Sequence, residues 1–226
     1  MKEHTVRSFD EALQTVIGDV LEMAHLARGQ LAAAIDLLGQ DAADETLMTI
    51  DDEEDRVDEL DARIAGEVQR LLALRQPVGV DLRTLISCDR IATDLERIGD
   101  HSKSIAERFM RITEQPSGRE ESLRIRPLAD SVLEQLDRAI EAIEQGDAAA
   151  AKAVCAADRK VDALYDETFR VQVEAMCRKP NSAPGSAHAL FIAKSLERVG
   201  DHATNVAEDL IYWLEGERSS KRENPA

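Results

Sequence analysis

Glu96-Arg97-Ile98-Gly99-Asp100-His101 recurs 101 residues later in the chain as Glu197-Arg198-Val199-Gly200-Asp201-His202. The match extends over Ile91–Glu107 and Ile192–Glu208, in which 10 of 17 positions are identical. Coincidence produces a match of this kind on the order of once in a thousand chains. We conclude that the chain is a tandem duplication, and we expect its function to lie in what the two copies share.

The composition of the chain favours helices throughout. Ala, Leu, Glu, Asp and Arg dominate, aromatic residues make up 3% of the chain, and β-branched residues form no alternating runs. We therefore predict an all-α protein with six long helices of roughly 25 to 33 residues, arranged as a tandem repeat of two three-helix bundles. The first bundle should cover residues 1–116 and the second 117–216, and the polar tail 217–226 should be disordered.

Residues that start and stop helices mark the expected boundaries. Ser8-x-x-Glu11 has the spacing of a capping box and should open the first helix, which should stop near Gly39. The remaining breaks are expected at Asp41 as the cap of the second helix, at Pro77 with Asp81 capping the third, at Gly146-Asp147, at residues 180–186, and at a linker over 114–118.

The charge and the cysteines of the chain limit its partners and its compartment. A formal net charge of -17 argues against nucleic acid and anionic membrane surfaces, and favours cations or a basic protein surface. Three cysteines without C-x-x-C spacing indicate neither a disulfide framework nor a thiolate zinc site, and they fit a reducing cytoplasm. No signal-peptide core or apolar run of ~18 residues is present, so we expect neither export nor membrane insertion.

The motif helix separates its acidic residues from its apolar face. Glu96 and Asp100 point away from the apolar stripe, and a seam of small residues that includes Gly99 lies between them; Gly200 repeats this seam in the second half. A glycine inside a helix costs about 1 kcal/mol relative to alanine. The seam therefore either lets another helix or a ligand come close or reflects close packing alone. The stripe consists of Ile91, Leu95, Ile98, Ile105 and Phe109.

Each half also carries an acidic pair on its middle helix, with the same i, i+4 spacing as the pair in the motif. About nine such pairs are expected by chance from 45 acidic residues in 226, so the inference depends on their recurrence at equivalent positions. Like charges held this close repel, and a cation or a basic side chain must offset them. Arg97 and Arg198 are available, although each lies on a different face of its helix from the acids. Carboxylates suit Mg²⁺, Mn²⁺, Ca²⁺, iron or zinc. The candidate metal ligands are Glu54, Asp58, Glu96, Asp100, Asp158, Asp162, Glu197 and Asp201.

No catalytic apparatus is evident in the sequence. It has no Gly-rich phosphate loop, no G-x-S-x-G or H-E-x-x-H motif, and no Ser, Cys or Lys beside an activating base. Glu22-x-x-His25 is the only Glu-x-x-His in the chain, whereas a di-iron carboxylate bundle needs two. His101 and His202 diverge by about 100° from the acids that precede them, so we expect hydrogen-bonded surface histidines and not ligands.

Together these features resemble the PhoU family of accessory and regulatory proteins of bacterial phosphate transport. The resemblance covers residues 8–216. It is carried by Leu95-Glu-Arg-Ile-Gly-Asp100, Leu196-Glu-Arg-Val-Gly-Asp201, the Arg75-Gln-Pro77 turn leading into Asp81-Leu-Arg83, the middle-helix acidic pairs and Tyr212-Trp213.

The resemblance implies a site and a role. It implies a tandem of three-helix bundles that binds metal through the eight acids named above, in a cytosolic protein that forms homodimers. It also implies negative regulation of phosphate uptake and of the phosphate-starvation response. The implied partners are the ATPase subunit of the phosphate ABC transporter, which would recruit the protein to the inner face of the membrane, and a sensor histidine kinase. A metal-dependent hydrolase with paired carboxylates and a purely structural bundle are the alternatives from other classes.

The two copies of the motif differ at one position close to the acids. Lys103 stands three residues after Asp100, whereas Thr204 occupies the equivalent position of the second copy. Because the ammonium of Lys103 would compete with a metal ion, we expect the first half to bind cations more weakly than the second.

Overall fold

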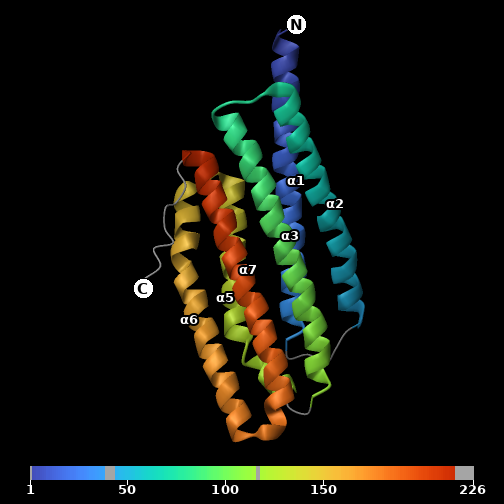
Figure 1. Cartoon of the computed structure of the whole chain (residues 1–226), viewed down its shortest axis with the longest axis vertical. Coiled ribbons are helices and arrows are strands. Elements are labelled where there is room, and N and C mark those ends of the chain that lie inside the picture. The colour runs from blue at the N-terminus through green and yellow to red at the C-terminus, as the bar shows by residue number, and fades with distance from the viewer. Residues whose placement is uncertain (1, 39–43, 116–117, 217–226) are drawn as a thin grey trace.

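The computed structural model describes residues 2–38, 44–115 and 118–216 (Figure 1). These residues contain no strand, which confirms the predicted all-α class. None of the helices in this part of the chain is long and apolar enough to cross a membrane. The elements are α1 (Lys2–Asp36), α2 (Asp44–Arg75), α3 (Val80–Thr113), α4 (Gly118–Leu123), α5 (Arg126–Gln145), α6 (Ala148–Arg178) and α7 (Ala183–Glu215), with a 3-10 turn, η1, at Pro180–Ser182.

The two halves lie side by side and share one core. Helices α1, α2 and α3 pack against one another, and α5, α6 and α7 do the same. In Figure 1, α2 and α6 lie at opposite edges of the molecule, while α3 and α7 meet in the middle. The α3–α7 pair makes the most extensive contact between any two helices, and the buried apolar side chains of both halves form one continuous cluster. The tandem repeat is confirmed, and its two bundles are joined along their motif helices.

Two boundary predictions lie outside the described residues. The division between 116 and 117 falls on residues that are not described, although α3 ends before it at Thr113 and α4 begins after it at Gly118. The tail 217–226 and the expected stop and cap at Gly39 and Asp41 also lie outside the described ranges. The domain boundaries and the disordered tail therefore stay predictions.

One of the six long helices is shorter than predicted. Helix α5 has 20 residues, and the short helix α4, with 6 residues, precedes it. Pro127 lies in the first turn of α5. Because proline has no N–H and its ring clashes with the preceding turn, a helix cannot run through from α4 to α5. The break at Pro127 was missed in the sequence.

Two of the predicted helix caps are wrong and one is confirmed. Helix α1 begins at Lys2, so Ser8 lies inside it and its hydroxyl accepts a hydrogen bond from Arg75 at 2.9 Å; no Pro or Gly precedes Ser8 to stop the helix from propagating. Asp81 is in the first turn of α3, because Gly79, with φ 62, takes the N-cap position. Asp147 does cap α6, accepting hydrogen bonds from the backbone N–H groups of Ala149 and Ala150 at 2.8 and 3.1 Å.

Candidate functional site

The apolar stripe of the motif helix is buried, and this fixes where its acids lie. All five predicted stripe residues of α3 have no exposed surface. Glu96 and Asp100 lie off this stripe, with side chains 23% and 43% exposed, on the side of α3 that faces the acids of α2. Desolvation chiefly raises the pKa of Glu96, followed by the charge of Asp100, with smaller contributions from Asp61 and Asp58. The charges of the acids on α2 and α3 therefore act on one another.

The four candidate acids of the second half also act on one another electrostatically. The pKa of Asp162 is raised first by desolvation and then by the charges of Asp158, Asp201, Glu197 and Asp166, in that order. We call Asp158, Asp162, Glu197 and Asp201 the α6–α7 acidic cluster. All eight predicted acids thus fall into two groups, one in each half. Within the described ranges, no three His, Cys, Asp or Glu side chains converge in the geometry of a metal site.

Three of the four candidate acids of the first half, Glu54, Glu96 and Asp100, are paired with basic side chains. Lys103 on α3 forms ion pairs with Glu54 and with Asp51, the latter at 3.1 Å, and these contacts raise the pKa of the lysine. Arg97 reaches both Glu96, at 3.2 Å, and Asp100, at 2.9 Å. Arg97 was expected on a different face of the helix from these acids, yet its side chain is long enough to pair with both of them.

The α6–α7 acidic cluster also has two cationic partners, Lys194 and Arg198, and both contact the acids of α7. Asp158 accepts hydrogen bonds from two neutral groups, the Thr204 hydroxyl at 3.0 Å and the Gln135 amide at 3.4 Å. Among the described residues, no basic side chain forms an ion pair with Asp158 or Asp162. Arg198 is 3.5 Å from Asp201 and 4.0 Å from Glu197, looser than the equivalent contacts of Arg97. The repulsion within this cluster is therefore only partly offset by the protein itself.

One oxygen of Glu197 is buried without a hydrogen bond. Lys194 Nζ lies 2.6 Å from Glu197 Oε2. The contact does not have hydrogen-bond geometry, so this buried oxygen has no hydrogen-bond partner among the described residues. The charge of this oxygen is nevertheless offset by the Lys194 ammonium, so the missing hydrogen bond does not mark a place for another ion.

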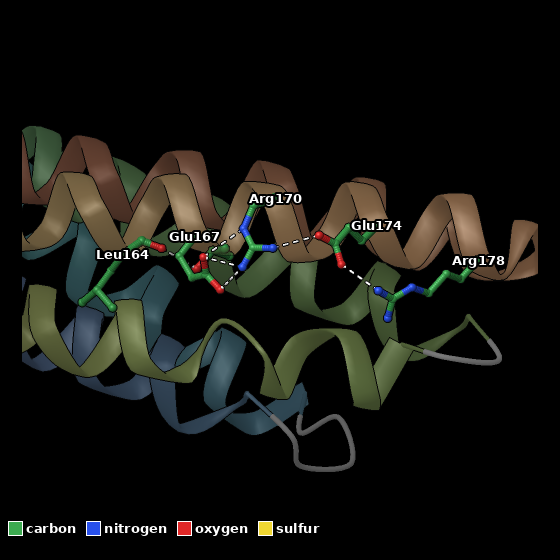
Figure 2. Close-up of polar contacts among 6 residues, drawn as sticks. Leu164, Glu167, Arg170, Glu174 and Arg178 are labelled. Carbon is green, nitrogen blue, oxygen red and sulfur yellow. Dashed lines mark hydrogen bonds and ion pairs between the residues drawn. The ribbon is translucent and has the colours of Figure 1, made fainter.

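The C-terminal part of α6 shows how acidic side chains on a solvent-exposed helix face are neutralised by neighbouring arginines. Figure 2 shows Glu167, Arg170, Glu174 and Arg178 alternating in charge along the helix. Arg170 binds Glu167 at 2.6 Å and Glu174 at 2.8 Å, and Arg178 binds Glu174 at 2.9 Å. Pairs of this kind, at i, i+3 and i, i+4, offset the repulsion between acids on a solvated face. Asp158 and Asp162, on the same helix, lack this arrangement.

Side chains of neighbouring helices occupy the space beside the glycines of the small-residue seam. A Cβ atom on Gly99 would lie 2.9 Å from Gln30 Oε1, and one on Gly200 would lie 3.1 Å from Val161 Cγ1 and 3.2 Å from Gln135 Oε1. The glycines therefore admit a buried glutamine from the first long helix of each half, α1 or α5. These glutamines were missed in the sequence, although each stands in the apolar stripe of its helix, Gln30 beside Leu31 and Gln135 beside Leu136.

His101 and His202 meet between the two halves. Their ring centroids are 5.7 Å apart, and His202 Nδ1 lies 2.7 Å from Asp94 Oδ1 on α3. The predicted hydrogen bonding is thus confirmed for His202, but its side chain is only 20% exposed, so the surface position is wrong. The reason is that α3 and α7 pack with their two motif copies facing one another. Burial chiefly, and then the neighbouring His202, lower the pKa of His101.

Comparison with known proteins identifies relatives over nearly the whole chain. A family model described as the PhoU domain matches residues 20–109 and again 125–210, once in each half. A protein of Caulobacter vibrioides named phosphate-specific transport system accessory protein PhoU homolog is 35% identical over 96% of this chain and 94% of its own length. The homolog of that name from Pseudomonas aeruginosa is 31% identical over 96% of this chain and 89% of its own length.

Two solved structures have the same fold. The crystal structure of PhoU from Pseudomonas aeruginosa superposes with a TM-score of 0.87 at 31% identity, covering 92% of this chain and 100% of that chain. The phosphate transport system regulatory protein PhoU from Streptococcus pneumoniae gives a TM-score of 0.80 at 24% identity, covering 94% of this chain and 100% of that chain.

Proposed function

This chain belongs to the PhoU family, and on that premise we propose that it is a negative regulator of phosphate uptake and of the phosphate-starvation response. Its relatives are named as accessory proteins of phosphate-specific transport, which supports a role in the regulation of phosphate transport. In this proposal the chain is an adaptor that links the ATPase subunit of the phosphate ABC transporter to a sensor histidine kinase. It works at the inner face of the membrane, as a homodimer, through protein contacts.

The observation that carries the adaptor role is the α6–α7 acidic cluster. Its four carboxylates lie within electrostatic reach of one another, and the basic side chains around them leave Asp158 and Asp162 without an ion pair among the described residues. A patch of one charge that is not balanced within the protein attracts an oppositely charged surface and speeds its association. We propose that a basic surface of a partner, or a bound cation, completes this cluster.

We propose that a metal ion binds the acids of the second half on the strength of their chemistry, since no three of the described His, Cys, Asp and Glu side chains converge as ligands. Asp158, Asp162, Glu197 and Asp201 would hold it, because ionised carboxylates are the ligands that Mg²⁺, Mn²⁺, Ca²⁺ and iron prefer, and zinc also accepts them. A bound dication would offset the repulsion between these acids and so brace α6 against α7. Elemental analysis of protein purified without chelator, beside the Asp158→Ala/Asp162→Ala variant, measures the metal directly.

A partner-binding experiment tests the adaptor role. We expect Glu197→Ala/Asp201→Ala to weaken binding of the ATPase subunit or the kinase by about tenfold or more, because the charge complementarity of the contact is lost. The matched control is Glu167→Ala/Glu174→Ala, which removes the same charge from the α6 face of Figure 2 and should leave binding unchanged. Helicity is followed by circular dichroism. Equal binding of both partners by wild type and both variants would refute the proposed docking surface.

The alternative of a metal-dependent hydrolase has no observation in its favour. Such an enzyme needs an open coordination position and a general base beside room for a substrate. A cavity of about 30 Å³ lies beside Gln135 between α5 and α6, which is room for a water molecule and not for a phosphoester. The named relatives are accessory proteins of phosphate-specific transport.

A further inference from the structure

Helices α6 and α7 carry an exposed aromatic patch, which we define as Tyr165, Phe169, Val173 and Phe191. Phe169 and Val173 of α6 are 48% and 37% exposed, and Phe191 of α7 is 55% exposed. The rings of Tyr165 and Phe169 lie beside each other, with centroids 6.5 Å apart. The chain has four phenylalanines, so half of them stand in this patch. Single exposed apolar side chains are normal, whereas a group of them marks a site of interaction.

The patch continues from α6 to α7. The Lys194 ammonium of α7 lies 5.2 Å from the centroid of the Tyr165 ring of α6, which fixes the register of the two antiparallel helices (Figure 1). Phe191 precedes Lys194 by about one turn, and Phe169 follows Tyr165 by about one turn. Phe169 and Phe191 therefore lie at the same level of the α6–α7 pair.

The equivalent positions of the first half are polar or small. They follow from aligning the acidic pairs of α2 and α6 and the motif copies of α3 and α7. The core position Val161, by contrast, is Val57 in the first half, and both valines are buried. A bundle of this kind thus needs the buried valine but not the exposed aromatic residues. In the order of the patch, the equivalents are Asp61, Ala65, Gln69 and Arg90.

The face of α6 that carries the patch also carries two acids. At 100° per residue, Asp158, Asp162, Tyr165 and Val173 fall within about 40° of Phe169. Neither acid has an ion pair in the part of the chain that the structure describes. The face from Asp158 to Val173 is about 22 Å long at 1.5 Å per residue. One face of α6 is therefore acidic at one end and apolar at the other.

We propose that this face of α6, together with Phe191, is the docking surface for an amphipathic helix of a partner protein, with an apolar stripe at one end and basic residues at the other. The inference rests on the adaptor role in the proposed function and names the chemistry of the partner. The apolar side chains at 165, 169 and 173 recur every four residues, which is the ridge against which a second helix packs. Helices bind through apolar anchors at this spacing, and aromatic residues dominate such contacts.

Charge favours a basic partner helix over a second copy of this chain. A second copy brings another net charge of -17. A twofold contact centred on Phe169 would place Asp162 of one copy opposite Met176 of the other, so the acids would gain no basic partner. A helix with lysine or arginine beyond its apolar stripe pairs with both acids while its apolar side chains cover the patch.

Fluorescence anisotropy of designed helical peptides with the full chain tests the surface. One peptide carries leucines at i, i+4 and i+8 and lysines at i-7 and i-3, and a second has the reverse order for the opposite helix direction. We expect one of them to bind. Replacement of its lysines by glutamates should weaken binding by about tenfold or more, because the charges then repel Asp158 and Asp162.

Substitutions that give the patch the residues of the first half locate the contact. Phe169→Ala/Val173→Gln and Phe191→Arg should each weaken peptide binding by about tenfold or more. The matched control is Leu74→Ala/Val80→Ala, which removes side chains 66% and 58% exposed from the turn between α2 and α3 and should leave binding unchanged. Circular dichroism checks that each variant keeps its helices. Equal binding by wild type and the patch variants, or no binding of either peptide, would overturn the docking surface.

Two other occupants of the patch are outcomes of the same set of variants. Sedimentation velocity that shows a dimer for the wild type and a monomer for Phe169→Ala/Val173→Gln would assign the patch to a contact between copies. Binding of the wild type, but not of this variant, to phosphatidylcholine vesicles would assign it to a membrane surface. Either result would overturn the partner helix.

The partner-binding experiment separates this inference from the proposed function. If the ATPase subunit or the kinase binds Phe169→Ala/Val173→Gln as it binds the wild type, but binds Glu197→Ala/Asp201→Ala more weakly, the adaptor role stands and the aromatic patch is not its docking surface. If the wild type binds the peptide through the patch but binds neither named partner, the docking surface stands and those partners are wrong.

Discussion

At the scale of single residues, the side chains that pack against the two motif glycines explain why glycine stands at these positions. Gly99 and Gly200 lie inside long helices, where glycine costs about 1 kcal/mol relative to alanine. That cost is accepted because a Cβ would meet Gln30 in the first half and both Val161 and Gln135 in the second. Gln30 is held in place by its amide, which donates to the Ile50 carbonyl at 3.2 Å. The glycine of each motif thus serves the junction of three helices.

Alanine substitution of these glycines should lower the free energy of unfolding. We expect Gly200→Ala to cost about 1–3 kcal/mol, because the stiff Val161 side chain cannot move aside, and Gly99→Ala to cost less, because only the end of Gln30 must shift. Gly66→Ala is the control: nothing lies within 4 Å of its Cβ position, so it should stabilise the protein by about 0.5–1 kcal/mol. Urea unfolding measures all three. A stabilising Gly200→Ala would show that the seam has no packing role.

At the scale of helices, the contact between α3 and α7 has an approximate twofold arrangement. His101 and His202 stack at its centre. Arg90 pairs with Asp209 at 3.3 Å, and the residues 101 positions away from these two, Phe191 and Arg108, also meet, with Arg108 Cζ 4.3 Å from the Phe191 ring centroid. An ion pair on one side of the centre is therefore a cation–π contact on the other. The duplication kept the geometry of this contact and changed its chemistry.

The pH dependence of stability should report the burial of Asp209 in this contact. Desolvation chiefly raises its pKa from 3.8 to about 6, so the folded protein holds a proton that the unfolded chain has released. The stability that this proton contributes is present below the unfolded pKa and is lost as the pH rises through about 6. We expect Asp209→Asn to gain about 1 kcal/mol relative to wild type between pH 5 and pH 7.5, measured by urea unfolding.

The quantity to compare is the difference in free energy of unfolding between wild type and Asp209→Asn. The titration of His101 changes the stability of each protein in the opposite direction with pH, and this difference removes its effect. Because the pKa of His101 is lowered in the folded protein, the stability that its neutral form contributes is lost as the pH falls below about 6.5. This loss is equal in wild type and variant. A difference that stays constant over this pH range would show that Asp209 titrates as it does in the unfolded chain.

At the scale of the whole molecule, the two halves depend on each other. Beside the α3–α7 contact, α1 and α5 are joined by Arg28, which binds Asp137 through two nitrogens at 2.8 and 3.2 Å, and by His25, 2.9 Å from Glu144. The apolar cluster continues from one half into the other. A half removed from its partner would expose part of this core.

Residues 1–115 expressed alone should therefore not be a stable monomer. The face of α3 that packs on α7 would be open to water, and an apolar face of that kind drives association. Since α3 and α7 carry copies of one motif, we expect two such fragments to pair through α3 and form a dimer. Light scattering after size exclusion gives the mass, and circular dichroism gives the Tm. A monomer with the Tm of the full chain would show that each bundle is stable by itself.

The sequence alone determined the all-α class, the duplication and the buried stripe of α3. These follow from properties of one helix at a time: periodicity places side chains on a face, and repetition shows that the face is shared. The tertiary structure decided that Gln30 and Gln135 fill the glycine seam, that Lys103 pairs with α2 while Lys194 stays on α7, and that the motif histidines meet. Such contacts depend on the offset and rotation of one helix against another, which the packing of the entire core sets and no single segment encodes.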